Sequence, residues 1–325
     1  MTKILITGAS GYIGSCVYFF LKNKYNLITI DKETNTYFKV NQCDLLNKKK
    51  LNNLLKSLKP NLVIHLAAQS LVDEKINKEK YYKNNVLATK NLLACMKENS
   101  INNIIFSSTA ALYKFSNNAL KENNKLNPKS TYAKTKYLCE KIIKKSKMNN
   151  IILRFFNVCS ALTKPMLIGE FHNPETHLIP TLTYKNIFKK KFYIYGNNYN
   201  TIDGTCIRDY VHIHDICNAI NKSIKLFKNK NKTQEIINIG GSNKLTNLQI
   251  MHKIEKTTKI KSNFSFVKKR KGDVSSLVCS NDKAKKVLKW KPERSNIDII
   301  IKDEINWIKK FTKKDKKRIF KNYLN

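Results

Sequence analysis

The sequence has few of the residues that mark several common classes of protein. It contains nine glycines and five arginines in 325 residues, and only 23 acidic residues stand against 62 basic ones. No uncharged apolar run approaches the roughly 18 residues that a membrane-spanning helix needs, and the apolar segment near the N-terminus is too short for a signal-peptide core. We therefore expect a cytoplasmic protein. Hydrophobic residues make up 42% of the chain, which excludes a mainly disordered state.

The eight cysteines show no pattern of a disulfide framework or of a metal site. No CxxC pair occurs, and no His/Cys cluster has the spacing of zinc ligands. We expect reduced and mostly buried thiols, and no bound metal.

The net charge of +39 suggests nucleic-acid binding, because lysines that neutralise phosphates release counterions. The composition favours another explanation. Lysine supplies 57 of the 62 basic residues and is spread along the whole chain. An excess of Lys and Asn with few Arg and Gly indicates an AT-rich coding sequence, so we expect no specific nucleic-acid partner. Because glycine and arginine are scarce in this chain, the positions where they do occur are stronger indicators of a functional site than in an average sequence.

Short apolar strands alternate with helical stretches in the first half of the chain. Strands are predicted at 3–7, 27–30, 62–65, 103–107 and 151–155, with helices to about residue 22 and around 47–58, 80–99 and 130–147. This alternation predicts an α/β fold, a Rossmann-like doubly wound parallel sheet with helices on both faces. We assign residues 1–157 to this Rossmann-like domain, whose fold commonly binds dinucleotides.

The alternation breaks after residue 157. A loop with Pro165, Pro174 and Pro180 precedes a helix near 178–190 and a strand at 192–195. The segment 209–228 is predicted to be one helix, and we expect about 206–232 to return to the first domain. Residues 158–205 and 233–325 then form a smaller C-terminal α/β domain.

Three of the nine glycines lie in the segment TGASGYIG, between the first strand and the following helix. Gly8, Gly11 and Gly14 would let the backbone approach a pyrophosphate at the positive end of the helix dipole. Asp31, at the end of the next strand, would accept hydrogen bonds from the adenosine ribose and repel a 2′-phosphate, which favours NAD over NADP. Asp44 is placed to meet the adenine amino group, although it would also make a good helix N-cap.

Tyr132 and Lys136 stand four residues apart on a predicted helix and so share one face. A tyrosine acts as a base near pH 7 only if its pKa of about 10 falls by several units. A neighbouring ammonium and the positive nicotinamide of NAD could supply this shift.

Spacing alone does not select this pair. Three Tyr/Lys pairs have it: Tyr18 and Lys22, Tyr132 and Lys136, and Tyr137 and Lys141. Only Tyr132 follows a strand that ends in a hydroxyl cluster, FSSTAALY, in which Thr109 can hydrogen-bond a substrate oxygen or the tyrosine. We therefore expect Thr109, Tyr132 and Lys136 to be catalytic.

Further motifs occur in the order and spacing of a known family. Together with the glycine turn and Asp31, the segments HLAAQS, YYKNNV, YAKTK, LRFFN, DGTCIRDYVHIHD and KRKGD resemble the extended short-chain dehydrogenase/reductases, and among them the NAD-dependent epimerase/dehydratase enzymes. The resemblance covers nearly the whole chain. It implies a redox-neutral isomerase that interconverts UDP-galactose and UDP-glucose through a 4-keto intermediate, with hydride exchanged with tightly bound NAD, and a homodimer.

The resemblance also implies roles for individual residues. Tyr132 would take the proton of the sugar 4-hydroxyl, Lys136 would hold the nicotinamide ribose and Thr109 would orient the 4-oxygen. The other implied cofactor contacts are Tyr12, Ile13, Leu45, Leu66, Ala67, Ala68, Ser70, Asn84 and Phe156. The implied contacts to the nucleotide sugar are Phe155, Asn157, His177, Tyr195, Arg208, Arg270 and Asp273.

The two arginines among these contacts would grip the diphosphate. A guanidinium fork binds phosphate oxygens bidentately and a lysine cannot, so Arg208 and Arg270 suit this role in a lysine-rich chain. Ordinary surface ion pairs are the alternative explanation of both.

Some positions depart from the family pattern. Ser70 replaces a lysine that some epimerases use on the cofactor ribose, His177 replaces an Asn, and Phe155 replaces a common Tyr. Leu277 lies where bulk helps to decide whether an N-acetyl group fits, and its intermediate size leaves UDP-N-acetylhexosamines and UDP-pentoses as alternative substrates. The two alanines after Thr109 exclude the acid pair of a 4,6-dehydratase. A non-catalytic NAD- or nucleic-acid-binding protein is the alternative from another class.

Overall fold

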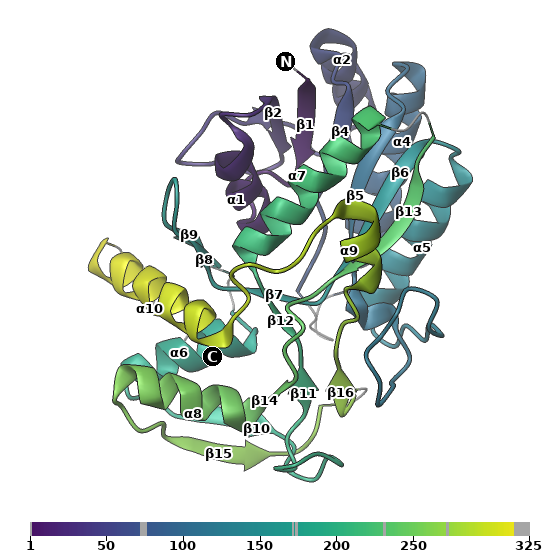
Figure 1. Cartoon of the computed structure of the whole chain (residues 1–325). Coiled ribbons are helices and arrows are strands. Elements are labelled where there is room, and N and C mark those ends of the chain that lie inside the picture. The colour runs from purple at the N-terminus through teal and green to yellow at the C-terminus, as the bar shows by residue number, and fades with distance from the viewer. Residues whose placement is uncertain are drawn as a thin grey trace.

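A seven-stranded sheet organises the N-terminal part of the chain (Figure 1). The structure is a computed structural model and describes residues 2–71, 77–170, 172, 175–229, 232–270 and 273–314. The strand order is β13-β6-β5-β4-β1-β2-β3, and every neighbouring pair is parallel. The strands are β1 (Lys3–Thr7), β2 (Asn26–Asp31), β3 (Asn41–Gln42), β4 (Leu62–His65), β5 (Asn103–Thr109), β6 (Asn149–Phe155) and β13 (Gln234–Ile239).

Helices cover both faces of this sheet, because its strands carry apolar side chains on both. In β1, Ile4 and Ile6 pack into the core beneath α1 and α7, whereas Leu5 packs into the core beneath α2, α4 and α5. The helices of the first face are α1 (Tyr12–Leu21) and α7 (Ile213–Asn229), and those of the second are α2 (Lys48–Leu58), α4 (Ala88–Glu98) and α5 (Thr131–Lys145). The expected doubly wound α/β fold is confirmed.

The strand order reverses between β1 and β4, which pair directly. The chain runs from β1 through β2 to β3 on one side and from β4 through β5 and β6 to β13 on the other. The loops after Thr7 and His65 therefore diverge from adjacent strand ends. Such a switch point is where doubly wound sheets bind their ligands.

A second lobe carries its own core beside the carboxyl ends of the strands (Figure 1). Its three main helices pack on one another: α6 (Leu178–Ile187), α8 (Asn247–Thr258) and α10 (Ile297–Lys314). Its short strands are β7 (Asn157–Cys159), β8 (Ala161–Leu162), β9 (Ile168–Gly169), β10 (Phe192–Tyr195), β11 (Ile207–Arg208), β12 (Tyr210–His212), β14 (Leu245–Thr246), β15 (Phe264–Val267) and β16 (Ser276–Leu277). Short segments complete the list of elements: α3 (Lys78–Tyr81), the π-helical η1 (Tyr82–Leu87), the 3-10 turn η2 (Ala110–Leu112) and α9 (Asp282–Leu288).

The expectation of one helix over 209–228 is wrong at its start. Residues 210–212 form β12, which pairs with β7, and α7 begins at Ile213. An extended backbone sends Tyr210 into the core of the second lobe and Val211 into the core of the first, and a helical turn would place them differently.

Strand β13 lies in the range expected for the second domain, yet it forms the edge of the seven-stranded sheet beside β6. We therefore propose that residues 234–239 belong with the first domain.

All eight cysteines are free and buried, as expected from the absence of any pairing pattern. Among the helices in the described part of the chain, none combines the length and the apolar composition that a bilayer crossing requires.

Candidate active site

The glycine turn lies at the switch point and is built by contacts within the protein. Gly8 has a φ of +72°, and a Cβ there would lie 2.5 Å from the backbone nitrogen of Ala67, in the loop after β4. A Cβ on Gly14 would lie 2.1 Å from the Gly8 carbonyl oxygen. Gly11, which precedes α1, has ordinary room, since its nearest contact is at 3.4 Å. The absence of a side chain at Gly11 therefore leaves open space at the helix N-terminus, as a phosphate cradle requires.

This difference between the glycines is testable. We expect Gly14→Ala to lower the free energy of unfolding by about 1–3 kcal/mol, because the methyl group must displace the Gly8 carbonyl. The same variant should retain less NAD through purification. Gly11→Ala is the matched control, and its urea midpoint should lie closer to that of the wild type, because its methyl group meets no atom nearer than 3.4 Å. Equal midpoints for Gly14→Ala and the wild type would contradict this account of the turn.

Asp31 ends β2 at the entrance of the glycine turn. Its carboxylate accepts hydrogen bonds from the backbone N–H of Ser10 at 3.0 Å and of Glu33 at 3.1 Å. These bonds hold the carboxylate beside the glycine turn. An adenosine ribose bound at this turn would lie next to it.

Asp44 does not cap the following helix. Asn47 is the N-cap of α2 and accepts from the backbone N–H of Lys50 at 3.0 Å, while Asp44 accepts from Leu46 at 2.8 Å within a local turn. The capping alternative for Asp44 is therefore wrong, and its carboxylate lies exposed.

The loop after β4 faces the glycine turn across the switch point. Its residues Leu66, Ala67 and Ala68 are half-buried. Of the other expected cofactor contacts, Ile13 and Asn84 are half-buried, Leu45 and Phe156 are buried and Ser70 is exposed. The Tyr12 hydroxyl donates to the carbonyl of Ser160 at 2.6 Å and so joins α1 to the second lobe. The glycine cradle and Asp31 fit an NAD molecule.

The expected catalytic residues meet at the end of β5 and the start of α5. Ser130 caps α5 by accepting from the backbone N–H of Ala133 at 3.1 Å, which places Tyr132 in the first turn. The Thr109 hydroxyl lies close enough to the Tyr132 phenol to act on its pKa. Lys136 lies one turn further along, 3% exposed, with its ammonium 4.4 Å from the centroid of the Phe106 ring.

Burial dominates the acid–base properties of this pair. It raises the pKa of Tyr132 to about 12, and the nearby Thr109 hydroxyl opposes part of the rise. Burial lowers the pKa of Lys136 to about 8. In this environment the phenol of Tyr132 therefore favours its neutral form.

Asn85 links the loop after β4 to the catalytic helix, a role that the sequence analysis missed. Its side-chain oxygen accepts from the backbone N–H of Gln69 at 2.7 Å, and its amide donates to the Thr135 hydroxyl at 2.9 Å. Thr135 donates in turn to the carbonyl of Tyr132 at 2.8 Å. Two adjacent asparagines stand in YYKNNV, and only the burial of Asn85 distinguishes it from Asn84.

His65 holds the switch point together as a neutral residue. Its Nδ1 lies 2.7 Å from the Thr7 hydroxyl and its Nε2 lies 3.0 Å from the Thr89 hydroxyl. Because Thr89 donates its own proton to the carbonyl of Asn85 at 2.6 Å, its oxygen accepts from His65, which places the imidazole proton on Nε2. Burial and the Lys136 charge lower the pKa of His65 to about 3, so it remains uncharged.

The expected diphosphate contacts come together in the second lobe. The Arg208 guanidinium donates to the carbonyl of Val274 at 2.8 Å and to Asp273 at 2.5 Å, so it is held in place by the protein itself. The backbone N–H of Asp273 donates to the carbonyl of Arg270 at 3.2 Å. Arg270 is exposed, and its guanidinium carbon lies 3.9 Å from the centroid of the Tyr195 ring. Arg208 thus does form an ion pair, although only 13% of its side chain is exposed.

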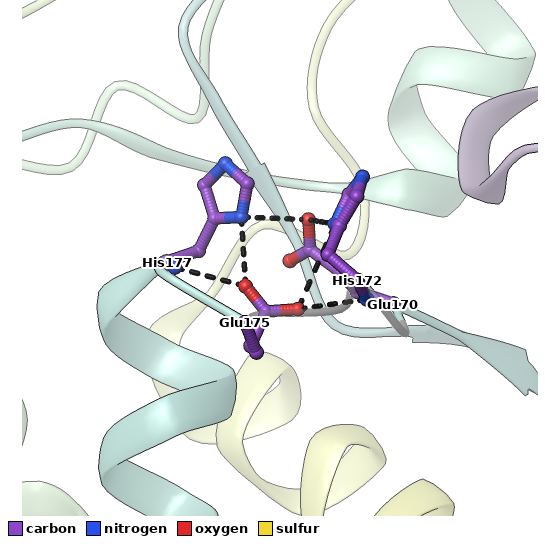
Figure 2. A group of neighbouring side chains, drawn as sticks. All are labelled: Glu170, His172, Glu175 and His177. Carbon is purple, nitrogen blue, oxygen red and sulfur yellow. Dashed lines mark hydrogen bonds and ion pairs between the residues drawn. The ribbon is translucent and has the colours of Figure 1, made fainter. Parts of the chain in front are cut away.

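Of the remaining expected substrate contacts, Asn157 borders the same region, as does Leu277. Phe155 is buried at the end of β6, and the Asn157 amide donates to the carbonyl of Asp209 at 2.9 Å. Leu277 in β16 is half-buried and pairs with Arg208 in β11. His177 precedes α6 and lies in a cluster of histidines and glutamates (Figure 2).

The fold and this arrangement define a class of protein. The chain belongs to the NAD dependent epimerase/dehydratase family, whose model matches residues 4–240. Two relatives are both named UDP-glucose 4-epimerase. The UDP-glucose 4-epimerase of Lactobacillus helveticus is 35% identical over 96% of this chain and 98% of its own length. That of Mycoplasma genitalium is 32% identical over 95% of this chain and 97% of its own.

Solved structures agree with this assignment. The UDP-glucose 4-epimerase of Brucella ovis in complex with NAD is similar with a TM-score of 0.89 and 28% identity, covering 95% of this chain and 98% of that one. The Bifidobacterium longum enzyme in complex with NAD+ and UDP gives a TM-score of 0.87 and 25% identity over 95% of this chain and 98% of that one.

Proposed function

We propose that the protein is a UDP-glucose 4-epimerase, which interconverts UDP-galactose and UDP-glucose with NAD as a bound cofactor. The observation that carries the proposal is the placement of Thr109 beside Tyr132, one helical turn from the buried Lys136 and at the carboxyl edge of the strands that hold the glycine turn. Relatives with this activity align over nearly their whole length.

In the proposed mechanism, each residue at the carboxyl edge of the sheet has a separate role. Bound NAD supplies a group that can accept hydride from the sugar C4 and return it. Tyr132 takes the proton of the 4-hydroxyl and later gives it back, and Thr109 hydrogen-bonds the same oxygen. Lys136 holds the nicotinamide ribose, while Asp31 binds the adenosine ribose. The redox state of the enzyme is unchanged after each turnover.

The second lobe is proposed to hold the uridine diphosphate. Arg208, already oriented by Asp273 and the Val274 carbonyl, would offer its remaining N–H groups to phosphate oxygens. Arg270 would close over the diphosphate from its exposed position on Tyr195. Phe155, Asn157 and His177 would surround the sugar, and Asp273 would contact a nucleotide hydroxyl. We also propose a homodimer, on the resemblance of the sequence to its family.

A product assay tests the function directly. Purified protein should convert UDP-galactose into UDP-glucose without added NAD, as measured by chromatographic separation of the sugars. Parallel incubations with UDP-N-acetylgalactosamine and UDP-arabinose determine whether Leu277 admits other sugars. No turnover of any of the three, combined with tight DNA binding that weakens steeply with salt, would instead favour the nucleic-acid alternative.

A further inference from the structure

Four side chains gather at one point in the segment that leads from β9 to α6: Glu170, His172, Glu175 and His177 (Figure 2). Both histidines turn Nδ1 toward the carboxylates, and each Nδ1 lies 3.0 Å from the same oxygen of Glu170. The Glu175 oxygens lie 3.6 Å from His172 Nδ1 and 2.9 Å from His177 Nδ1. One ligand atom of each residue lies within 4.8 Å of all the others.

These separations match the edges of a small coordination shell. A zinc ion binds imidazole nitrogen and carboxylate oxygen at about 2.0–2.2 Å, which places tetrahedral ligands about 3.4 Å apart. The nitrogen–oxygen separations in the cluster, from 2.9 to 3.6 Å, bracket that value. We propose that the cluster binds a divalent first-row metal ion of the Zn²⁺ class, in a closed site with four protein ligands. Imidazole and carboxylate donors with no thiolate suit such an ion.

Polar atoms within the cluster and beside it that lack hydrogen bonds support the proposal. Glu170 Oε2 and His172 Nδ1 are buried without a hydrogen-bond partner of good geometry. Glu304, on α10, is fully buried, and neither of its carboxylate oxygens has a hydrogen-bond partner. Burial raises the pKa of Glu304, and the charges of Glu170 and Glu175 add to the rise. Several buried carboxyl groups thus lie close together, and a dication would compensate their charge.

The ligands are also held by a second layer of contacts, as metal ligands usually are. The Glu175 carboxylate accepts from the backbone N–H groups of His172 at 3.2 Å, Thr176 at 2.9 Å and His177 at 2.9 Å. The Trp307 indole donates to the carbonyl of Glu170 at 2.9 Å. Because Trp307 lies on α10, a bound ion would fix the entry to α6 against both β9 and α10.

The expectation of no metal site rested on cysteines and on His/Cys spacing, whereas this cluster contains no cysteine. Its pattern, E-x-H-x-x-E-x-H, was visible in the sequence. One consequence rests on the proposed function, although the site itself does not. With an ion on Nδ1, His177 carries its proton on Nε2, which points away from the carboxylates (Figure 2) and could donate to the anionic substrate.

The test measures metal directly on the full chain. Protein produced in zinc-supplemented medium is analysed for metal content, and Zn²⁺ is titrated against a chelator of known affinity. We expect one equivalent per chain, and Co²⁺ in its place should give the visible absorption of tetrahedral coordination. His172→Ala should weaken binding by at least about tenfold. His252→Ala is the matched control, because His252 forms a single exposed pair with Glu255 at 3.1 Å, and it should bind as the wild type does.

Two results would overturn the proposal. The first is wild-type protein that neither contains metal nor shifts its Tm with added Zn²⁺, which would leave two imidazoliums paired with the glutamates. The second is equal Zn²⁺ affinity in His172→Ala and wild type. The wild-type measurement decides the matter even if a variant fails to fold. Since metal content is read without turnover, a failure of the epimerase proposal stays distinguishable from a failure of this one.

Discussion

Replacing Tyr132 with phenylalanine is expected to lower kcat by about 10²–10⁴-fold, the usual contribution of a positioned acid–base group. The ring and its packing remain, and only the hydroxyl beside Thr109 is lost. Because the hydroxyl acts on the proton of the sugar, NAD content and the affinity for UDP should change little. The measurement is the initial rate of UDP-glucose formation from UDP-galactose at saturating substrate.

Tyr137→Phe is the matched control on the same helix. Tyr137 is half-buried and carries the Lys141 ammonium 4.4 Å from its ring centroid, so it repeats the Tyr/Lys spacing away from Thr109. Its variant should keep kcat within about twofold, since no hydroxyl near the reacting carbon is removed. Similar rates for Tyr132→Phe and the wild type would refute the assigned base.

Removal of the Arg154 guanidinium is expected to cost about 3–5 kcal/mol of unfolding free energy, because it leaves a buried carboxylate unpaired. Arg154, on β6, makes a bidentate pair with Glu140 on α5 at 2.9 and 2.7 Å, with 2% and 3% of the two side chains exposed. The Ser108 hydroxyl donates to the same glutamate at 2.5 Å. The pair therefore supports the strand end and the helix that carry the catalytic residues. Urea unfolding of Arg154→Met measures the loss.

Two further variants separate pairing from packing. Arg154→Met combined with Glu140→Leu removes both charges and should recover most of the stability, since well-packed apolar residues can replace a buried ion pair. Lys253→Met breaks the exposed pair with Asp298, in which the side chains are 36% and 63% exposed, and should cost at most about 1 kcal/mol. Losses of the same size for Arg154→Met and Lys253→Met would contradict the assigned role of the buried pair.

Local patterns in the sequence predict those parts of the molecule that local physics decides. The apolar runs at 3–7, 62–65 and 192–195 form strands with these bounds, and the glycine turn joins the first of them to a helix. Tyr132 and Lys136 share a helix face because spacing alone fixes it. Pairing between distant segments is not local, so the strand at 210–212 and the edge strand at 234–239 were missed.

Contacts that depend on tertiary structure could not be predicted from the sequence. No local sequence pattern indicates that His65 bridges two threonines from different elements, or that Asn85 rather than Asn84 is buried. Similarly, position 14 requires glycine because a side chain there would collide with the Gly8 carbonyl within the turn, and not because a ligand approaches it.

The few arginines of the chain occupy positions with specific interactions, including positions outside the expected substrate site. Each described arginine has a specific partner: Arg154 pairs with Glu140, Arg208 with Asp273 and Arg294 with Asp303, and Arg270 lies on Tyr195. Arg318 lies outside the described residues. In a chain rich in lysine, arginine thus serves the positions where a planar fork or a flat cation is needed.

The burial of all eight cysteines affects how the molecule responds to thiol reagents. Burial raises the pKa of every one of these thiols, and the thiolate is the reactive form. A native molecule should therefore be alkylated or oxidised only as fast as its segments open. Five of the cysteines lie in the two cores that flank the sheet, whereas Cys159 lies in the core of the second lobe. Their order of modification would reveal which part of the fold opens first.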